Sequence, residues 1–146
     1  MRPVVRILMT ALGLALSIGF WGCDESTTVV TDEGVLCFHA TEGADAFEAG
    51  APITVGVELE DCLSSSCDVD REGFCEVEVG AGEIVVHAEF SWANTGDSMC
   101  TSDCGTIVAE CTSAPLPSGD YEVRFGSVTY TTFAVPDDGE SHCFNQ

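Results

Sequence analysis

The sequence has 146 residues, enough for one domain and too few for two of ordinary size. It carries 25 acidic residues against four arginines and no lysine, a formal net charge of −21. Such a chain is repelled by phosphates and has no basic cluster, which argues against nucleic acid as a partner and against electrostatic docking on anionic lipid.

The chain opens with a short basic segment, Met1 to Arg6, and an apolar run from Ile7 to Phe20 that contains no acidic residue. This order is typical of a secretory signal. The run is shorter than the roughly 20 residues of a membrane span. Residues 1–22 are therefore predicted to be a signal peptide. A second interpretation is ordinary cleavage after Gly19, which would release a secreted chain that begins at Phe20.

The segment Phe20-Trp21-Gly22-Cys23 resembles the lipobox of bacterial lipoproteins, in which a small residue directly precedes the cysteine that receives the lipid. Gly22 matches that position, whereas Phe20 and Trp21 differ from the usual leucine and small residue. The resemblance implies a lipoprotein whose Cys23 carries diacylglycerol and a palmitate-type acyl chain. It implies attachment to the cell envelope, at the periplasmic face or the cell surface. Residues 23–34 are predicted to be a polar tether and residues 35–146 a cysteine-rich domain.

Alternation of apolar and polar residues predicts short strands over residues 35–40, 53–60, 75–79, 83–92, 106–112, 121–125 and 128–135. Gly80-Ala81-Gly82 and Gly126-Ser127 are expected to form hairpin turns. The apolar phase slips after Tyr130, which predicts a bulge near residues 131–132. No helical periodicity follows Cys23. About seven strands with one apolar face each predict a two-sheet sandwich, because each sheet has to bury that face.

The segment Leu116 to Tyr121 resembles the entry to the penultimate strand of immunoglobulin-like domains, where a tyrosine hydroxyl bonds back to the preceding loop. Tyr121 would take that role. The resemblance implies an all-β, disulfide-stapled, immunoglobulin-like two-sheet sandwich. Val123 stands where antibody domains have a cysteine, so the likeness is to the broad class of sandwiches, which hosts many unrelated functions.

With Cys23 set aside, eight cysteines remain, and an exported chain is expected to pair them in four disulfides. They comprise two outlying residues and two clusters of three: Cys37, Cys62, Cys67, Cys75, Cys100, Cys104, Cys111 and Cys143. The simplest scheme joins Cys37 to Cys143 and places one bridge within each cluster and one between the clusters. Other pairings remain open, because spacing alone does not decide connectivity.

The acidic stretch between Cys67 and Cys75 is the best candidate for a metal site. Asp68, Asp70 and Glu72 alternate as in the opening of a calcium loop. The twelfth position, counted from Asp68, is Val79 and not the bidentate glutamate of an EF-hand, which excludes that motif. A looser Ca²⁺ site remains an alternative to the favoured interpretation, an exposed acidic loop pinned by cysteines. No other cofactor is expected.

No nucleophile elbow or other catalytic motif occurs, so the sequence predicts a protein that is not an enzyme. Two long loops, 61–74 and 93–105, are the candidate contacts for a protein partner, because stapled loops lose less entropy on binding. Phe74 and Met99 could supply their apolar contacts. The expected function is a lipid-anchored, non-catalytic surface or periplasmic interaction or structural module. The alternatives are a calcium-dependent adhesion or ligand-binding domain, and a small secreted inhibitor or hydrolase.

Overall fold

The structure, a computed structural model, describes residues 26–96 and 99–144. The predicted signal peptide over residues 1–22 and the predicted lipid site at Cys23 lie outside the described residues. The described part of the chain forms nine β-strands and no α-helix. It accordingly holds no helix long and apolar enough to cross a membrane.

The larger sheet is built around one long central strand, β5 (Glu83–Asn94). Antiparallel β4 (Asp68–Val79) pairs with one edge of β5 along its whole length. Two strands share the opposite edge: antiparallel β1 (Ser26–Thr31) covers its second half, and parallel β7 (Gly119–Phe125) covers its first half. β8 (Val128–Val135) completes this sheet beside β7.

Asp32 and Gly126 join the two strands that share the edge of β5. The Asp32 backbone N–H donates to the Ala88 carbonyl at 2.8 Å, and the Ala88 N–H donates to the Asp32 carboxylate at 3.0 Å. Gly126 donates to the Val86 carbonyl at 3.3 Å and lies so close to Asp32 that a side chain at this position would collide with it. The hydrogen-bond ladder of β5 is therefore continued through the gap between β1 and β7.

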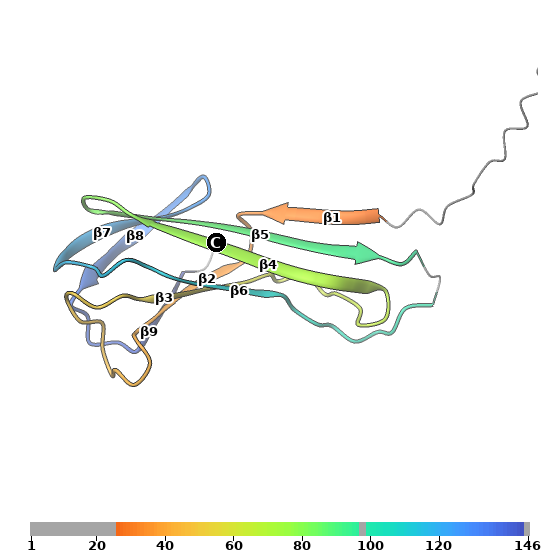
Figure 1. Cartoon of the computed structure of the whole chain (residues 1–146), viewed down its shortest axis with the longest axis horizontal. Coiled ribbons are helices and arrows are strands. Elements are labelled where there is room, and N and C mark those ends of the chain that lie inside the picture. The colour runs from red at the N-terminus through yellow and green to blue at the C-terminus, as the bar shows by residue number, and fades with distance from the viewer. Residues whose placement is uncertain (1–25, 97–98, 145–146) are drawn as a thin grey trace, which may run out of the picture.

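The smaller sheet is entirely antiparallel, in the order β6-β3-β2-β9. Its strands are β2 (Val35–His39), β3 (Thr54–Glu58), β6 (Val108–Thr112) and β9 (Ser141–Phe144). The two sheets stack as layers of a molecule that is elongated along its strands (Figure 1). The all-β, two-sheet prediction is therefore confirmed, with nine strands in the described residues in place of about seven.

The core lies between the sheets and consists of the apolar residues that the alternating pattern placed on one face. On β5 these are Ile84, Val86, Ala88, Phe90 and Trp92, all of which are buried. A cluster of aromatic rings fills one end of the core, where Phe133 lies edge-on to Phe38 and Phe47 with ring centroids 5.2 and 4.9 Å apart. Edge-to-face contacts of this kind add to the free energy gained by burying the rings.

Several boundaries differ from the sequence prediction, β9 was not predicted, and two differences bear on the candidate surface. Residues 26–31, assigned to a polar tether, form β1, because their backbone pairs with the part of β5 that β7 does not reach, and their Thr and Val side chains suit a strand. The predicted loop over 61–74 is too long, since β4 begins at Asp68. A bulge at Asp70 and Arg71 masks the strand pattern there: Asp70 has φ = 51°, and the register shifts between Val69 and Glu72.

Other local predictions are confirmed. The Tyr121 hydroxyl donates to the carbonyl of Pro117 at 2.8 Å, within the loop before its own strand. Phe125 pairs with Val128 across the turn at Gly126-Ser127. β8 carries one extra residue between Thr129 and Thr132, which is the bulge that the slip in apolar phase predicted.

All eight cysteines of the described residues are paired, in four disulfides. Cys37 is bonded to Cys143, its direct neighbour across β2 and β9, as predicted. The simplest scheme was right to expect a bridge between the clusters but wrong to place one within each, because no bridge lies within a cluster. The three others all join the clusters: Cys62–Cys104, Cys67–Cys100 and Cys75–Cys111. Four disulfides suggest an extracellular or periplasmic protein.

Candidate interaction surface

The predicted calcium ligands lie at the beginning of β4. The Asp68 carboxylate accepts hydrogen bonds from the Ser64 N–H at 2.8 Å and from the Asn94 amide at 2.9 Å. It therefore fastens the loop before β4 to the end of β5. Asp70 and Glu72 are exposed. Within the described residues, no three His, Cys, Asp or Glu side chains are grouped so that they could hold a metal ion.

Arg71 lies beside these carboxylates and is directed at backbone oxygens. Its Nε donates to the Asp68 carbonyl at 2.7 Å and its Nη2 to the Leu63 carbonyl at 3.1 Å. The guanidinium also packs against Gly105, whose backbone exchanges two hydrogen bonds with Leu63. One side chain from the bulge in β4 thus ties together both of the loops predicted from the sequence.

We expect the substitution Arg71→Met to lower the free energy of unfolding by about 2 kcal/mol, because two half-buried carbonyls lose a charged donor. Chemical denaturation under non-reducing conditions measures the change. Arg124→Met is the matched control, since Arg124 forms an exposed ion pair with Glu83 at 2.9 Å. An exposed pair of this kind contributes about 0–1 kcal/mol. Equal losses for the two variants would contradict the structural role given to Arg71.

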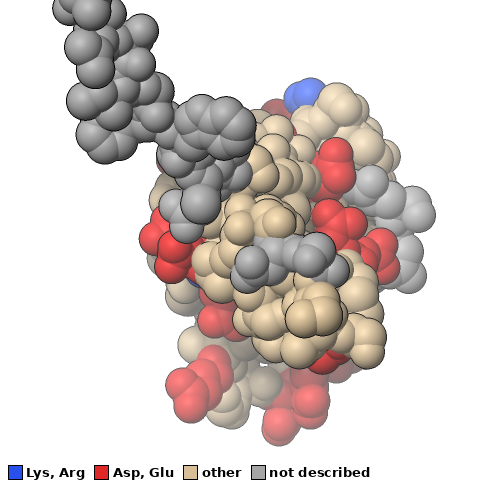
Figure 2. All heavy atoms as spheres, turned by 90° about the vertical axis from the view of Figure 1, so that its right-hand side faces the viewer, with Lys and Arg blue, Asp and Glu red and all other residues tan. Residues whose placement is uncertain are grey.

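A hydroxyl cluster connects the two loops next to the Cys67–Cys100 bridge. The Thr101 hydroxyl lies 3.1 Å from that of Ser64 and 3.2 Å from that of Ser66. Hydrogen bonds from Ser65 and Thr101 lower the pKa of the exposed Asp103 to about 2. Both loops lie at the end of the molecule where β1 begins, and Met99 is 89% exposed there. Asp and Glu side chains dominate the charged atoms visible at this end (Figure 2).

Phe74 lies elsewhere, in the middle of β4 on the outer face of the larger sheet, and its side chain is 63% exposed. Across β5 it forms a row with Glu89 and Thr31. The next row holds Glu72, Ser91 and Val29, and Val29 is 54% exposed. We call the surface formed by these six residues the Phe74 face: Val29, Thr31, Glu72, Phe74, Glu89 and Ser91.

Two shallow hollows flank the Phe74 ring. One of about 390 Å³ is lined by Glu72, Gly73, Phe74, Glu89 and Ser91. The other, of about 190 Å³, continues past Glu89 to Asp32 and His87, whose carboxylate and ring Nδ1 lie 3.4 Å apart. An exposed aromatic ring between two hollows, rimmed by carboxylates, is suited to contact a partner.

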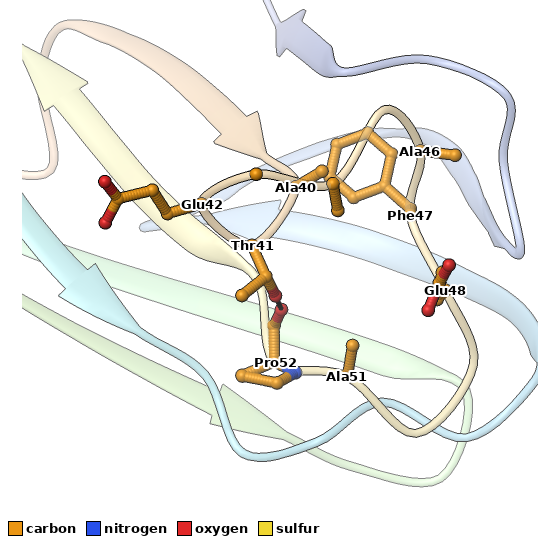
Figure 3. Close-up of a pocket in the computed structure, with 10 residues that line it drawn as sticks. Ala40, Thr41, Glu42, Ala46, Phe47, Glu48, Ala51 and Pro52 are labelled. Carbon is orange, nitrogen blue, oxygen red and sulfur yellow. Dashed lines mark hydrogen bonds between the residues drawn. The ribbon is translucent and has the colours of Figure 1, made fainter.

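A further hollow of about 400 Å³ lies inside the loop between β2 and β3, and Figure 3 shows the residues that line it. Alanine side chains form much of its wall, and the Phe47 ring points across it toward Ala40. Thr41 donates to the Pro52 carbonyl at 2.7 Å, which closes the loop on itself. Glu42 and Glu48 point away on different sides (Figure 3), so the hollow has no converging polar groups to orient a ligand.

Sequence reasoning singled out Phe74 but placed it in a loop, and it missed Val29 and Glu89. One signal was available, because Phe74 interrupts the series of glutamates Glu72, Glu76 and Glu78 on the polar face of β4. Val29 and Glu89 come next to Phe74 only through the pairing of β1 and β4 with β5. Comparison of the chain with protein-family models, curated proteins and solved structures finds no match.

Proposed function

We propose that the protein is an exported, lipid-anchored, non-catalytic module of the bacterial cell envelope that binds a protein partner through the Phe74 face. The observation that carries this proposal is the Phe74 side chain, 63% exposed on a strand face that is otherwise polar. Exposed apolar side chains grouped between hollows mark interaction surfaces more often than catalytic sites. The surface is open and shallow, as contact surfaces for proteins are.

The position of Cys23 supports an anchor at one end of the sandwich. Ser26, the first residue of β1, comes three positions after Cys23 and pairs with Asn94 at the end of β5. Three residues of any chain reach at most about 11 Å. A lipid on Cys23 would therefore hold the end that carries the two stapled loops close to the membrane. The Phe74 face runs along the strands away from that end, and this is why we propose it, and not the loops, as the contact.

An immunoglobulin-like topology is part of the proposal. It is supported by the two stacked sheets and by the hydrogen bond from Tyr121 to Pro117. Cys75 on β4 is bonded to Cys111 on β6, so a disulfide joins the sheets along one side. The strands that it joins differ from those joined in antibody domains. This agrees with the sequence, because Val123 stands where antibody domains have the cysteine of their inter-sheet disulfide.

The anchor is tested by intact-mass measurement of the protein extracted from membranes. We expect the mature chain to begin at Cys23, to carry a diacylglycerol-sized increment, and to lack eight hydrogens because of its four disulfides. The substitution Cys23→Ser should abolish the increment and remove the protein from the detergent-extracted membrane fraction, because no lipid acceptor remains. A wild-type chain that begins at Phe20 and carries a free thiol would refute the anchor.

A further inference from the structure

The long strand β4 has one open edge. Among the described residues, β5 is the only strand hydrogen-bonded to β4, and β6 belongs to the opposite sheet. β6 passes beneath β4 rather than beside it: a side chain at Gly73, which would point inward, would meet the Val108 carbonyl and Ala109. The backbone along the edge of β4 is thus left without a neighbouring strand.

The hydrogen-bond pattern of the hairpin fixes which backbone groups face this edge. The Gly80 N–H donates to the Glu83 carbonyl at 2.8 Å, so this pair closes the turn. In an antiparallel ladder, hydrogen-bonded and non-hydrogen-bonded pairs alternate from there. From residue 73 to residue 79, the positions on the inward face of β4 therefore direct their N–H and C=O groups to the open edge: Gly73, Cys75, Val77 and Val79.

The exposed side chains from Glu72 to Glu78 on β4 lie on the outer face. Phe74 is flanked on β4 by three exposed glutamates, Glu72, Glu76 and Glu78. Charged residues on an edge strand commonly prevent unwanted strand pairing. Protection against strand pairing requires charged residues and not a large exposed aromatic ring. Phe74 nevertheless places such a ring in the middle of β4, with a hollow on each side.

Charge decides which kind of strand can occupy the edge. A second copy of this chain, which carries a net charge of −21, would place its own glutamates beside those of β4. Like charges in directly opposed positions on neighbouring strands are destabilising, whereas opposite charges are stabilising. A strand with arginine or lysine at every second position would instead pair its basic side chains with Glu72, Glu76 and Glu78.

We propose that β4 binds an extended basic segment of a partner protein by β-strand addition at its open edge, with Phe74 as the apolar anchor. This inference rests on the proposed function, which it deepens by naming the class of partner. Backbone hydrogen bonds supply affinity in this mode of recognition, and alternating side chains supply specificity. The partner segment presents basic residues on the face that it shares with Phe74 and small apolar residues on the other.

The test uses the purified protein, with or without lipid, and a fluorescent peptide of alternating arginine and valine. We expect saturable binding that weakens as salt concentration rises, and no binding of the same peptide with glutamate in place of arginine. Two further peptides carry N-methyl groups on either the arginine or the valine nitrogens. We expect one of them to lose binding and the other to keep it, because only alternate residues of an added strand donate to β4.

Two variants locate the peptide on the molecule. We expect Glu76→Gln combined with Glu78→Gln to weaken binding about three- to tenfold, through loss of two cross-strand charge pairs. The matched control is Glu58→Gln combined with Glu110→Gln, which removes two exposed carboxylates from the outer face of the smaller sheet and should leave binding within about twofold. Phe74→Ala should weaken binding about fivefold.

If the Glu76/Glu78 double variant and the Glu58/Glu110 control weakened binding equally, the binding would be due to general electrostatic attraction. That result would overturn the proposal. Unchanged binding of both N-methylated peptides would overturn it as well, since strand addition requires the backbone donors. Self-association of the protein through β4 in place of peptide binding would contradict the argument from charge. None of these results depends on the anchor, which the intact mass of the same preparation reports separately.

Discussion

The substitution Phe133→Ala is expected to lower the free energy of unfolding by about 4 kcal/mol. Phe133 is 1% exposed and lies between the two sheets, where its ring contacts Phe38, Phe47 and His142. Removing the ring leaves a cavity that neighbours from three different segments cannot fill together. It also removes the edge-to-face contacts with the Phe38 and Phe47 rings, each of which contributes about 0.5–1.5 kcal/mol beyond burial.

Chemical denaturation, followed by the fluorescence of buried Trp92, measures this loss. Phe74→Ala is the matched control, because it deletes the same side chain from a position that is 63% exposed. We expect that control to change stability by no more than about 0.5 kcal/mol, as surface substitutions usually do. A loss of several kcal/mol for Phe74→Ala would show that Phe74 is buried, and the Phe74 face would then have no basis.

Much of the fold was predictable because most strands have one face in the core and one in water. Strict alternation, as from Ile84 to Trp92, identifies the buried face, and the glycine turns fix the register of the two hairpins. The bulge in β8 was detectable for the same reason, since an inserted residue reverses the phase of the pattern. Tyr121 was identified through its resemblance to the tyrosine of immunoglobulin-like domains.

What escaped prediction depends on contacts between distant segments. Residues 26–31 are mostly exposed, so no apolar stripe distinguishes β1 from a polar tether. The parallel pairing of β5 with β7 cannot be recognised from the residue pattern of either strand. The cysteine clusters pair with each other because the segments that carry them lie close together, with β6 beneath β4 and the two stapled loops at one end. Spacing along the chain has no information about that arrangement.

The candidate surface shows the same limit. Phe74 could be recognised as an apolar side chain among acids, but its neighbours Glu89 and Val29 come from β5 and β1. The same pairing shows that one edge of β4 is open, which a single strand pattern cannot indicate. The acidic composition is important at this edge. Carboxylates beside unpaired backbone groups disfavour pairing with an acidic strand and favour pairing with a basic one.

The bridge between Cys37 and Cys143 is expected to contribute more to stability than any of the other three. Its two cysteines are 106 positions apart, whereas those of Cys62–Cys104 are 42 apart. The other bridges all connect residues 62–75 with residues 100–111, so among the disulfides of the described residues only Cys37–Cys143 restrains the segments outside them. Opening it releases both ends of the unfolded chain at once, which favours the unfolded state.

We therefore expect Cys37→Ala combined with Cys143→Ala to lower the free energy of unfolding by about 4 kcal/mol. Cys62→Ala combined with Cys104→Ala, the matched control, should lower it by about 1 kcal/mol less, because loop entropy grows with the logarithm of length. Denaturation under non-reducing conditions compares the two. Amide exchange should accelerate in β9, which Cys143 ties to β2, and not in β4. A greater loss for the control pair would contradict this order, since the loop that it closes is the shorter one.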